Sequence, residues 1–164
     1  MKALSFILPF TALAVIPGAL LLYFGFRICS PLIQIAVSLP FLAAGIALMA
    51  RTIALIHRTG RGTLAPWSPT EKLVIRGPYR YSRNPMITGL LFLLIAESIL
   101  FGSLAVAAWT IVFFATNTVY FKLFEEPGLV KRFGKEYEEY RNRVPMWFPE
   151  IIHWGGKNRK QRQG

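Results

Sequence analysis

The segment Gly77–Met86 (GPYRYSRNPM) combines rigid, cationic and aromatic residues immediately before a long apolar run. It contains two prolines, two arginines, two tyrosines and one asparagine, and no acidic residue. Asn84 and Pro85 are residue types that favour the N-cap and the first position of a helix, which by itself explains that pair. A helix N-terminus flanked by arginines is also suited to bind an anionic or carboxylate group. The segment is therefore a candidate binding site.

A second candidate feature is the adjacent pair Glu125 and Glu126, which follows the last long apolar run. Adjacent acids at a membrane edge are commonly solvated charges that pair with nearby lysines. In a chain with only eight acidic residues, the pair could instead hold an ammonium, a hydroxyl or a cationic cofactor. The residues leave both interpretations open. Asn117, Phe121 and Glu125 are spaced by four, which places them on one face of a helix.

Other reactive residues form no recognisable site. Glu97 is the one ionisable residue well inside an apolar run, and we interpret it as reaching toward the membrane interface. His57 and His153 have no metal-ligand spacing to another His or Cys, so no metal site is expected. Cys29 is the only cysteine, which excludes an intrachain disulfide.

The composition indicates a membrane protein rather than a nucleic-acid-binding protein. Of 164 residues, 54% are hydrophobic, yet the net charge is +11. The 19 Lys and Arg are segregated, with seven in residues 51–83 and ten in residues 122–162. Basic proteins often bind nucleic acid, but here basic blocks alternate with apolar runs. We therefore expect the lipid bilayer as a partner, no nucleic acid, and a single domain over residues 1–164.

Four apolar runs are expected to cross the membrane, since a spanning helix needs about 20 mostly apolar residues. They cover residues 4–26, 31–56, 86–101 and 103–121. The first is interpreted as a retained span, because it has no obvious signal-peptide cleavage site. Four spans place both termini and the 57–85 loop on the side that carries nearly every cation, which the positive-inside rule assigns to the cytosol. The expected fold is an all-α, multi-pass integral membrane bundle.

Two polar segments face that same compartment. The 57–85 loop is punctuated by glycine and proline and contains a β-like stretch, Leu73–Ile75. The tail, 122–164, begins with a predicted amphipathic helix that stops near Val144, before Pro145. Its apolar stripe consists of Leu129, Phe133, Tyr137 and Tyr140. Loop and tail are therefore candidates to build one site together.

The two segments carry a resemblance to integral-membrane methyltransferases. LVIRGPYRYSRNPM, followed after the next apolar runs by EEPGLVKRFGKEYEEYRNRVPMWFP, resembles isoprenylcysteine carboxyl methyltransferases and phospholipid N-methyltransferases. Those proteins carry Gly-x-Tyr-x-x-x-Arg-His/Asn-Pro at the opening of a span. A Glu-Glu pair follows the next span, and then a Phe-Gly-x-x-Tyr-x-x-Tyr helix. The resemblance covers residues 63–149, whereas the first two apolar runs match only as generic membrane helices.

The resemblance implies a cofactor, S-adenosylmethionine, enclosed by the loop and the tail helix, and a lipophilic acceptor such as a prenylcysteine-like carboxylate or a lipid amine. It implies cofactor-binding roles for Lys72, Leu73, Val74, Tyr79, Asn84, Pro85, Met86, Ile87 and Glu125. The candidates for a catalytic role are Arg83, Asn84 and Glu126. Ile87 stands where a tyrosine is usual, and Phe121 stands where the prenylcysteine enzymes carry a substrate-binding arginine. Both departures count against a prenylcysteine carboxylate as the acceptor.

Two alternatives stay open. NADPH-dependent sterol-type reductases share a related Arg-His-Pro-x-Tyr segment, although Asn84, Ile87 and the Glu-Glu pair depart from it. A non-catalytic membrane scaffold of the same fold is the other alternative, and Ile87 and Phe121 favour it. The sequence predicts neither the acceptor atom nor the oligomeric state.

Overall fold

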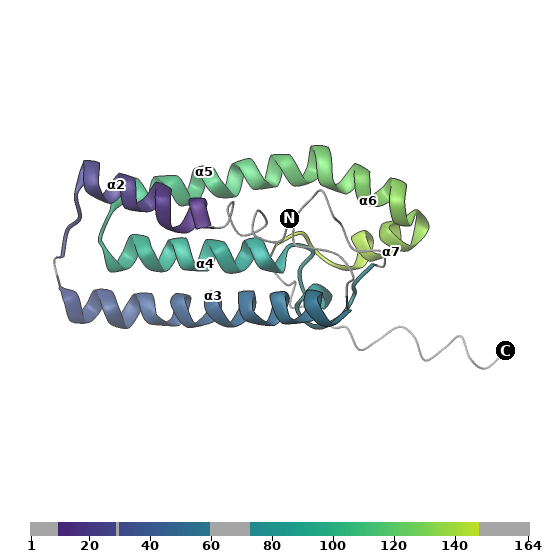
Figure 1. Ribbon diagram of the computed structural model, residues 1–164, viewed down its shortest axis with the longest axis horizontal. Helices are drawn as coiled ribbons and strands as arrows, with labels where there is room; N and C mark the ends of the chain where they lie inside the picture. Colours follow the sequence, from purple (N-terminus) through teal and green to yellow (C-terminus); the bar gives the residue numbers. More distant parts are fainter. Residues whose placement is uncertain (1–9, 29, 60–72, 148–164) are drawn as a thin grey trace.

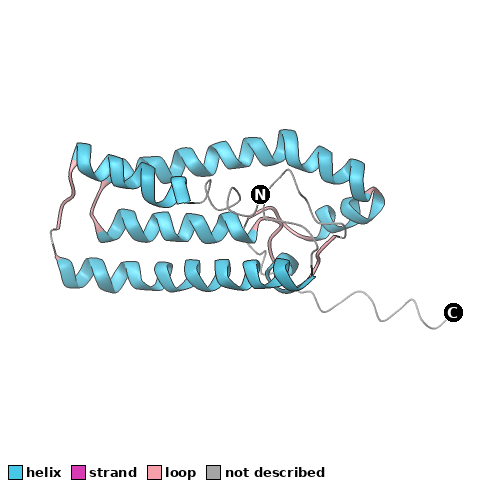
Figure 2. Cartoon of the chain, viewed as in Figure 1, coloured by secondary structure: helices cyan, strands magenta, loops and turns pink. Residues whose placement is uncertain are grey.

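The computed structural model describes residues 10–28, 30–59 and 73–147. Four helices lie side by side in an elongated bundle (Figure 1). They are α2 (Ile16–Phe24), α3 (Pro31–Thr59), α4 (Pro85–Leu100) and α5 (Leu104–Tyr120). Figure 2 shows that these ranges contain helices and loops but no β-strand, so the all-α prediction is confirmed for them. The β-like stretch Leu73–Ile75 has no regular secondary structure.

Among the described residues, two helices are long and apolar enough to cross a membrane, Pro31–Ile56 within α3 and the continuous helix Leu104–Phe133. The latter joins α5 to the π-helical turn η3 (Phe121–Glu125) and to α6 (Glu126–Phe133). The other apolar helices, α4 and Thr11–Phe24, are shorter. Thr11–Phe24 consists of the π-helical turn η1 followed by α2, and the first predicted run begins outside the described residues. The structure thus supports two of the four predicted spans.

Two glycines allow α3 and α4 to approach closely. A Cβ atom on Gly45 would lie 2.8 Å from Leu93 Cδ2 and 2.9 Å from the Gly89 carbonyl oxygen. A Cβ atom on Gly89 would lie 2.8 Å from Met49 Cγ. Small residues at a helix crossing let two backbones pack directly, which is the usual arrangement in membrane bundles. The position of α4, and of the loop that leads into it, is therefore fixed by α3.

One end of the bundle is closed by backbone contacts, and we call it the corner end. The Arg27 amide donates to the Phe101 carbonyl (3.0 Å). Gln34 Nε2 donates to the carbonyl oxygens of Arg27 (2.9 Å) and Ile99 (3.3 Å). Gly102 turns the chain between α4 and α5 with a φ of +55°, and a Cβ atom there would overlap the Arg27 carbonyl. Only glycine fits this position without displacement.

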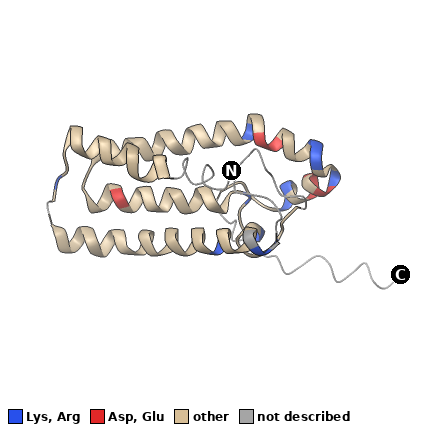
Figure 3. Ribbon diagram, in the orientation of Figure 1, with Lys and Arg blue, Asp and Glu red and all other residues tan. Residues whose placement is uncertain are grey.

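The opposite end gathers most charged side chains of the described residues, apart from Arg27 and Glu97 (Figure 3), and we call it the charged end. It comprises the turn η2 (Gly77–Arg80), the start of α4, and the helices α6 and α7 (Lys135–Arg143). The loop before α4 and the tail after α5 therefore meet at the end where the sequence predicts a site.

The predicted single tail helix is in fact two helices, α6 and α7, because Gly134 adopts a φ of +55° and interrupts the helix. The predicted end is confirmed, since α7 stops at Arg143 and Val144 is extended before Pro145. The predicted stripe converges in spite of the break. Tyr137, Tyr140 and Val144 form a buried core, packed against Leu73, Ile75, Leu129, Val130 and Phe133.

Candidate active site

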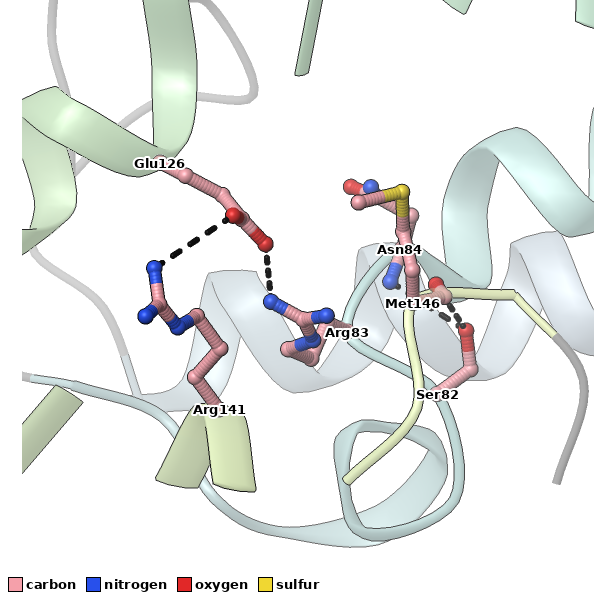
Figure 4. A network of polar contacts seen from close by, with 6 residues as sticks. All are labelled: Ser82, Arg83, Asn84, Glu126, Arg141 and Met146. Carbon is pink, nitrogen blue, oxygen red and sulfur yellow. Dashed lines mark hydrogen bonds and ion pairs between the residues drawn. The ribbon is translucent and has the colours of Figure 1, made fainter. Parts of the chain in front are cut away.

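The loop before α4 is joined to the tail through the backbone. The Arg83 amide donates to the Pro145 carbonyl (3.0 Å), and the Asn84 amide donates to the Met146 carbonyl (3.2 Å). Ser82 Oγ also donates to the Met146 carbonyl (3.0 Å). Figure 4 shows Met146 lying against Ser82 and Asn84. These bonds fix the tail at the N-terminus of α4, even though the two segments are far apart in the sequence.

A buried ion pair connects the same loop to α6. Arg83 Nη1 contacts Glu126 Oε1, and the two side chains are 10% and 11% exposed. The other oxygen of Glu126 lies 3.8 Å from Arg141 Nη1 on α7 (Figure 4). Both carboxylate oxygens therefore face arginines of the chain itself. The partners must hold each other in place, because a buried charge without a counter-charge is strongly unfavourable.

Asn84 and Pro85 start α4 as predicted, with Asn84 at the N-cap and Pro85 at the first helical position. The Asn84 side chain, however, makes no capping hydrogen bond. The backbone carbonyl oxygen of Asn84 accepts from the backbone amide and the hydroxyl of Thr88, both at 3.0 Å. Asn84 Nδ2 is buried and has no hydrogen-bond partner among the described residues. Since a buried donor without an acceptor is costly, this amide is suited to meet an acceptor on a bound molecule.

Tyr79 is held at the charged end by the tail, where Tyr140 Oη donates to the Tyr79 carbonyl (2.7 Å). Burial raises the pKa of the Tyr79 hydroxyl, and the negative charge of Glu125 raises it further. The hydroxyl therefore stays protonated at neutral pH and can donate a hydrogen bond. Glu125 is exposed and its charge acts on Tyr79, whereas Glu126 is buried and contacts Arg83. The two adjacent glutamates face different surroundings.

Four buried side-chain atoms without a partner among the described residues lie where this loop meets the tail: Arg83 Nε, Asn84 Nδ2, Tyr137 Oη and Trp147 Nε1. Burial raises the pKa of the Tyr137 hydroxyl, and the positive charge of Arg83 partly offsets this rise. The Tyr137 hydroxyl and the Arg83 side chain are nevertheless not in hydrogen-bonding geometry. Three of the four atoms can only donate, and the tyrosine hydroxyl can also donate. The arrangement therefore favours a molecule that brings hydrogen-bond acceptors.

The other predicted site residues are placed as follows. Met86 and Ile87 are half-buried in the first turn of α4, behind the fully buried Pro85. Val74 is half-buried, Leu73 packs on the tyrosine core, and Lys72 lies outside the described residues. Sequence reasoning missed Ser82, Arg141, Met146 and Trp147. A signal for the last two existed in the Val-Pro-Met-Trp end of the quoted tail motif.

The fold and this site define a helical protein with apolar spans and a polar site at one end of the bundle. The model of the phospholipid methyltransferase family matches residues 33–136, more than half of the chain. The chain belongs to the phospholipid methyltransferase family, which confirms the resemblance to membrane methyltransferases. The matched range contains α3, α4, α5 and α6, together with the loop before α4.

A curated relative is methanethiol S-methyltransferase 2 of Bradyrhizobium diazoefficiens, which is 34% identical over 77 residues. The aligned segment covers 45% of this chain but 27% of that protein. The chain thus matches little more than a quarter of the relative's length. The family and the two apolar helices together indicate a membrane location.

Proposed function

We propose that the protein transfers a methyl group from S-adenosylmethionine to a lipophilic acceptor in the membrane. The observation that carries this proposal is the Arg83–Glu126 ion pair, which joins the two motif-bearing segments. The side-chain amide nitrogen of Asn84, which has no partner among the described residues, belongs to the same loop. Membership of a methyltransferase family supports the reaction class. The two apolar helices support a membrane-borne acceptor.

The residues of the charged end fit such a cofactor, which has a cationic sulfonium, an ammonium and a carboxylate. Asn84 Nδ2 and the N-terminus of α4 suit the carboxylate. The ring of Tyr79 and the carboxylate of Glu125 suit the cationic groups. When bound, the cofactor supplies an electrophilic methyl group. The chain contributes alignment and exclusion of water, which can lower a barrier by about 7–11 kcal/mol in favourable cases.

Further cofactor contacts are proposed for the half-buried apolar residues around these polar groups and for Lys72. The half-buried apolar residues are Leu73, Val74, Met86 and Ile87, and the buried Pro85 is included as the first residue of α4. Arg83 and Glu126 have a different proposed role, because each is already engaged by the other. They position Asn84 and the start of α4 without touching the reacting atoms.

The proposed topology retains four spans, with the charged end and both chain termini in the cytosol. Among the described residues, Arg27 is the cation at the corner end, and the others gather at the charged end (Figure 3). That asymmetry supports the orientation. α4, with 16 residues, is about 24 Å long, shorter than the hydrocarbon layer of about 30 Å. A helix of this length cannot reach both membrane surfaces. We propose that its N-terminus lies close to the cytosolic surface, where a cytosolic cofactor and a lipid-borne acceptor can meet.

The buried Phe121 counts against a prenylcysteine carboxylate as the acceptor, because the resemblance implies a substrate-binding arginine at that position in the prenylcysteine enzymes. The family name suggests a phospholipid, and the relative's name suggests a thiol. We therefore propose that the methyl acceptor is a lipophilic molecule with a small polar group, and that this group contains the atom that is methylated.

The test is calorimetric titration of the detergent-purified protein with S-adenosylmethionine and, in parallel, with NADPH. We expect saturable binding of S-adenosylmethionine, abolished in Glu125→Ala with no change in unfolding temperature. Glu139→Ala is the matched control, since Glu139 is an exposed glutamate on α7 that pairs with Arg143. Binding of NADPH alone would instead favour a reductase, and binding of neither ligand a scaffold.

A further inference from the structure

Trp147 occupies an unusual position at the end of the described tail. Its side chain is buried, and its ring lies 5.3 Å from the ring of Phe114 on α5, at a tilt of 56°. The indole N–H is among the buried donors without a partner in the described residues. A buried tryptophan usually finds an acceptor for this group. By comparison, the N–H of Trp109, on the same helix as Phe114, donates to the Ala12 carbonyl (3.1 Å).

The position of Phe114 indicates the depth of Trp147. Phe114, Phe121 and Glu125 recur at spacings of seven and four, so they share one face of the continuous helix. Eleven residues separate Phe114 from Glu125, a rise of about 16 Å. Tyr79 and Glu125 lie at the charged end, whereas Phe114 lies toward the apolar middle of α5. Trp147 therefore lies on the bilayer side of the residues proposed to hold the cofactor.

Backbone hydrogen bonds attach the segment that precedes Trp147 to the start of α4. The residue before Trp147, Met146, accepts hydrogen bonds from the Asn84 amide and the Ser82 hydroxyl. An indole N–H can only donate, so its partner must offer a lone pair. Arg83 Nε and Asn84 Nδ2, on the loop that is bonded to Pro145 and Met146, are also donors without a partner among the described residues. A protonated amine cannot satisfy such a group, whereas an anionic oxygen or sulfur can.

We infer that Trp147 binds the polar end of the methyl acceptor, and that this end is anionic, a carboxylate or a thiolate carried on an apolar chain. This inference rests on the proposed function, which identifies the bound molecule as a methyl acceptor. The structure contributes a buried N–H donor that has no partner among the described residues. Phe114 and the indole ring form the apolar wall against which the chain of the acceptor packs.

The experiment uses the full chain in nanodiscs of zwitterionic phosphatidylcholine at about pH 8. At that pH, dodecanoate and 4-octylthiophenolate are anionic and dodecylammonium is cationic. Binding of each probe is measured calorimetrically, with and without S-adenosylmethionine. Trp147→Phe keeps an aromatic ring against Phe114 and removes only the N–H donor. We expect it to weaken binding of at least one anionic probe about tenfold, to leave dodecylammonium binding unchanged, and to preserve affinity for S-adenosylmethionine.

Trp109→Phe is the matched control, because it makes the same change where the N–H already has a partner. We expect it to leave binding of all three probes unchanged. The inference is overturned if Trp147→Phe leaves both anions unaffected, if it weakens the cationic probe equally, or if Trp109→Phe has the same effect. These outcomes are independent of the cofactor titration. Loss of anion binding in a protein that never binds S-adenosylmethionine would keep the anion site and remove only its assignment to methyl transfer.

Discussion

The two ends of the bundle treat their polar groups differently. At the corner end, Gln34 satisfies two carbonyl oxygens and Gly102 lies against Arg27, so the chain closes on itself. At the charged end, backbone bonds attach the tail to the start of α4, yet several side-chain donors remain unpartnered among the described residues. The corner end also keeps unpartnered atoms, Gln34 Oε1 and Glu97 Oε2, but these are acceptors.

This difference indicates that the corner end serves the stability of the fold, whereas the charged end is suited to bind a ligand. A structure that only had to be stable would pair its buried donors, because each unpaired donor costs about 1–3 kcal/mol. Arg83 Nε and Asn84 Nδ2 have no partner among the described residues, although the Arg83–Glu126 ion pair fixes the loop that carries them. Rigid backbone combined with unsatisfied side chains is what a pre-organised binding site requires. The comparison can be tested by perturbing each end in turn.

The largest effect is expected at the Arg83–Glu126 pair. Glu126→Ala would leave the Arg83 guanidinium buried without its counter-charge, and we expect a loss of about 3–5 kcal/mol in the free energy of unfolding. Glu139→Ala is the control, since its pair with Arg143 spans 3.7 Å and its side chains are 61% and 71% exposed. That control should cost no more than about 0.5 kcal/mol. Chemical denaturation in detergent measures both, and equal losses would mean that the buried pair does not fix the charged end.

An intermediate effect is expected from two glycines that share a φ of +55°, one at each end. Gly102→Ala and Gly134→Ala should each cost about 1–3 kcal/mol for the strained backbone. Gly102→Ala should cost about 1 kcal/mol more than Gly134→Ala, because its methyl group would overlap Arg27 and lie 2.8 Å from Gln34 Nε2. A methyl group at Gly134 meets no atom within 4 Å. Thermal unfolding of the two variants provides the comparison, and equal midpoints would show that the corner end is not tightly closed.

The smallest effect is expected from Glu97→Gln. Glu97 Oε2 has no hydrogen-bond partner among the described residues, and glutamine has nearly the same shape. We expect a change of less than about 0.5 kcal/mol in stability and no change in affinity for S-adenosylmethionine. The same calorimetric titration checks this. A large loss of affinity would make the corner end part of the site and would remove the distinction between the two ends.

Local features of this fold could be predicted from the sequence, because they depend on neighbouring residues. Pro85 has no amide hydrogen, so it starts α4, and Pro145 restricts the residue before it, so α7 ends at Arg143. The apolar runs were sufficient to predict a helical bundle. The break at Gly134 was missed, because a glycine inside a helical pattern can be tolerated or can adopt a positive φ, and the spacing of the stripe is similar in both cases.

The contacts that build the candidate site could not be predicted in the same way. The partnership of Arg83 with Glu126 rather than Glu125 depends on how α6 continues from α5 through a π-helical turn. Asn84 lies at the N-cap as expected, but its side chain makes no capping hydrogen bond. Its backbone amide donates to the Met146 carbonyl, a contact with the distant tail. Such pairings join distant segments, and nothing in the local pattern of either segment specifies the other.

The hydrogen bonds from Arg83 and Asn84 to Pro145 and Met146 also set the order in which the molecule can be completed during synthesis. The contacts of Arg27 with Phe101, Gly102 and Gln34 use no residue beyond Gly102, so they can form while the chain is still being made. The charged end needs Met146 and cannot close until the tail has left the ribosome. By then α3 and α4 are already available to pack at Gly45 and Gly89. A nascent chain that stops short of the tail would therefore be an inserted bundle with an open site.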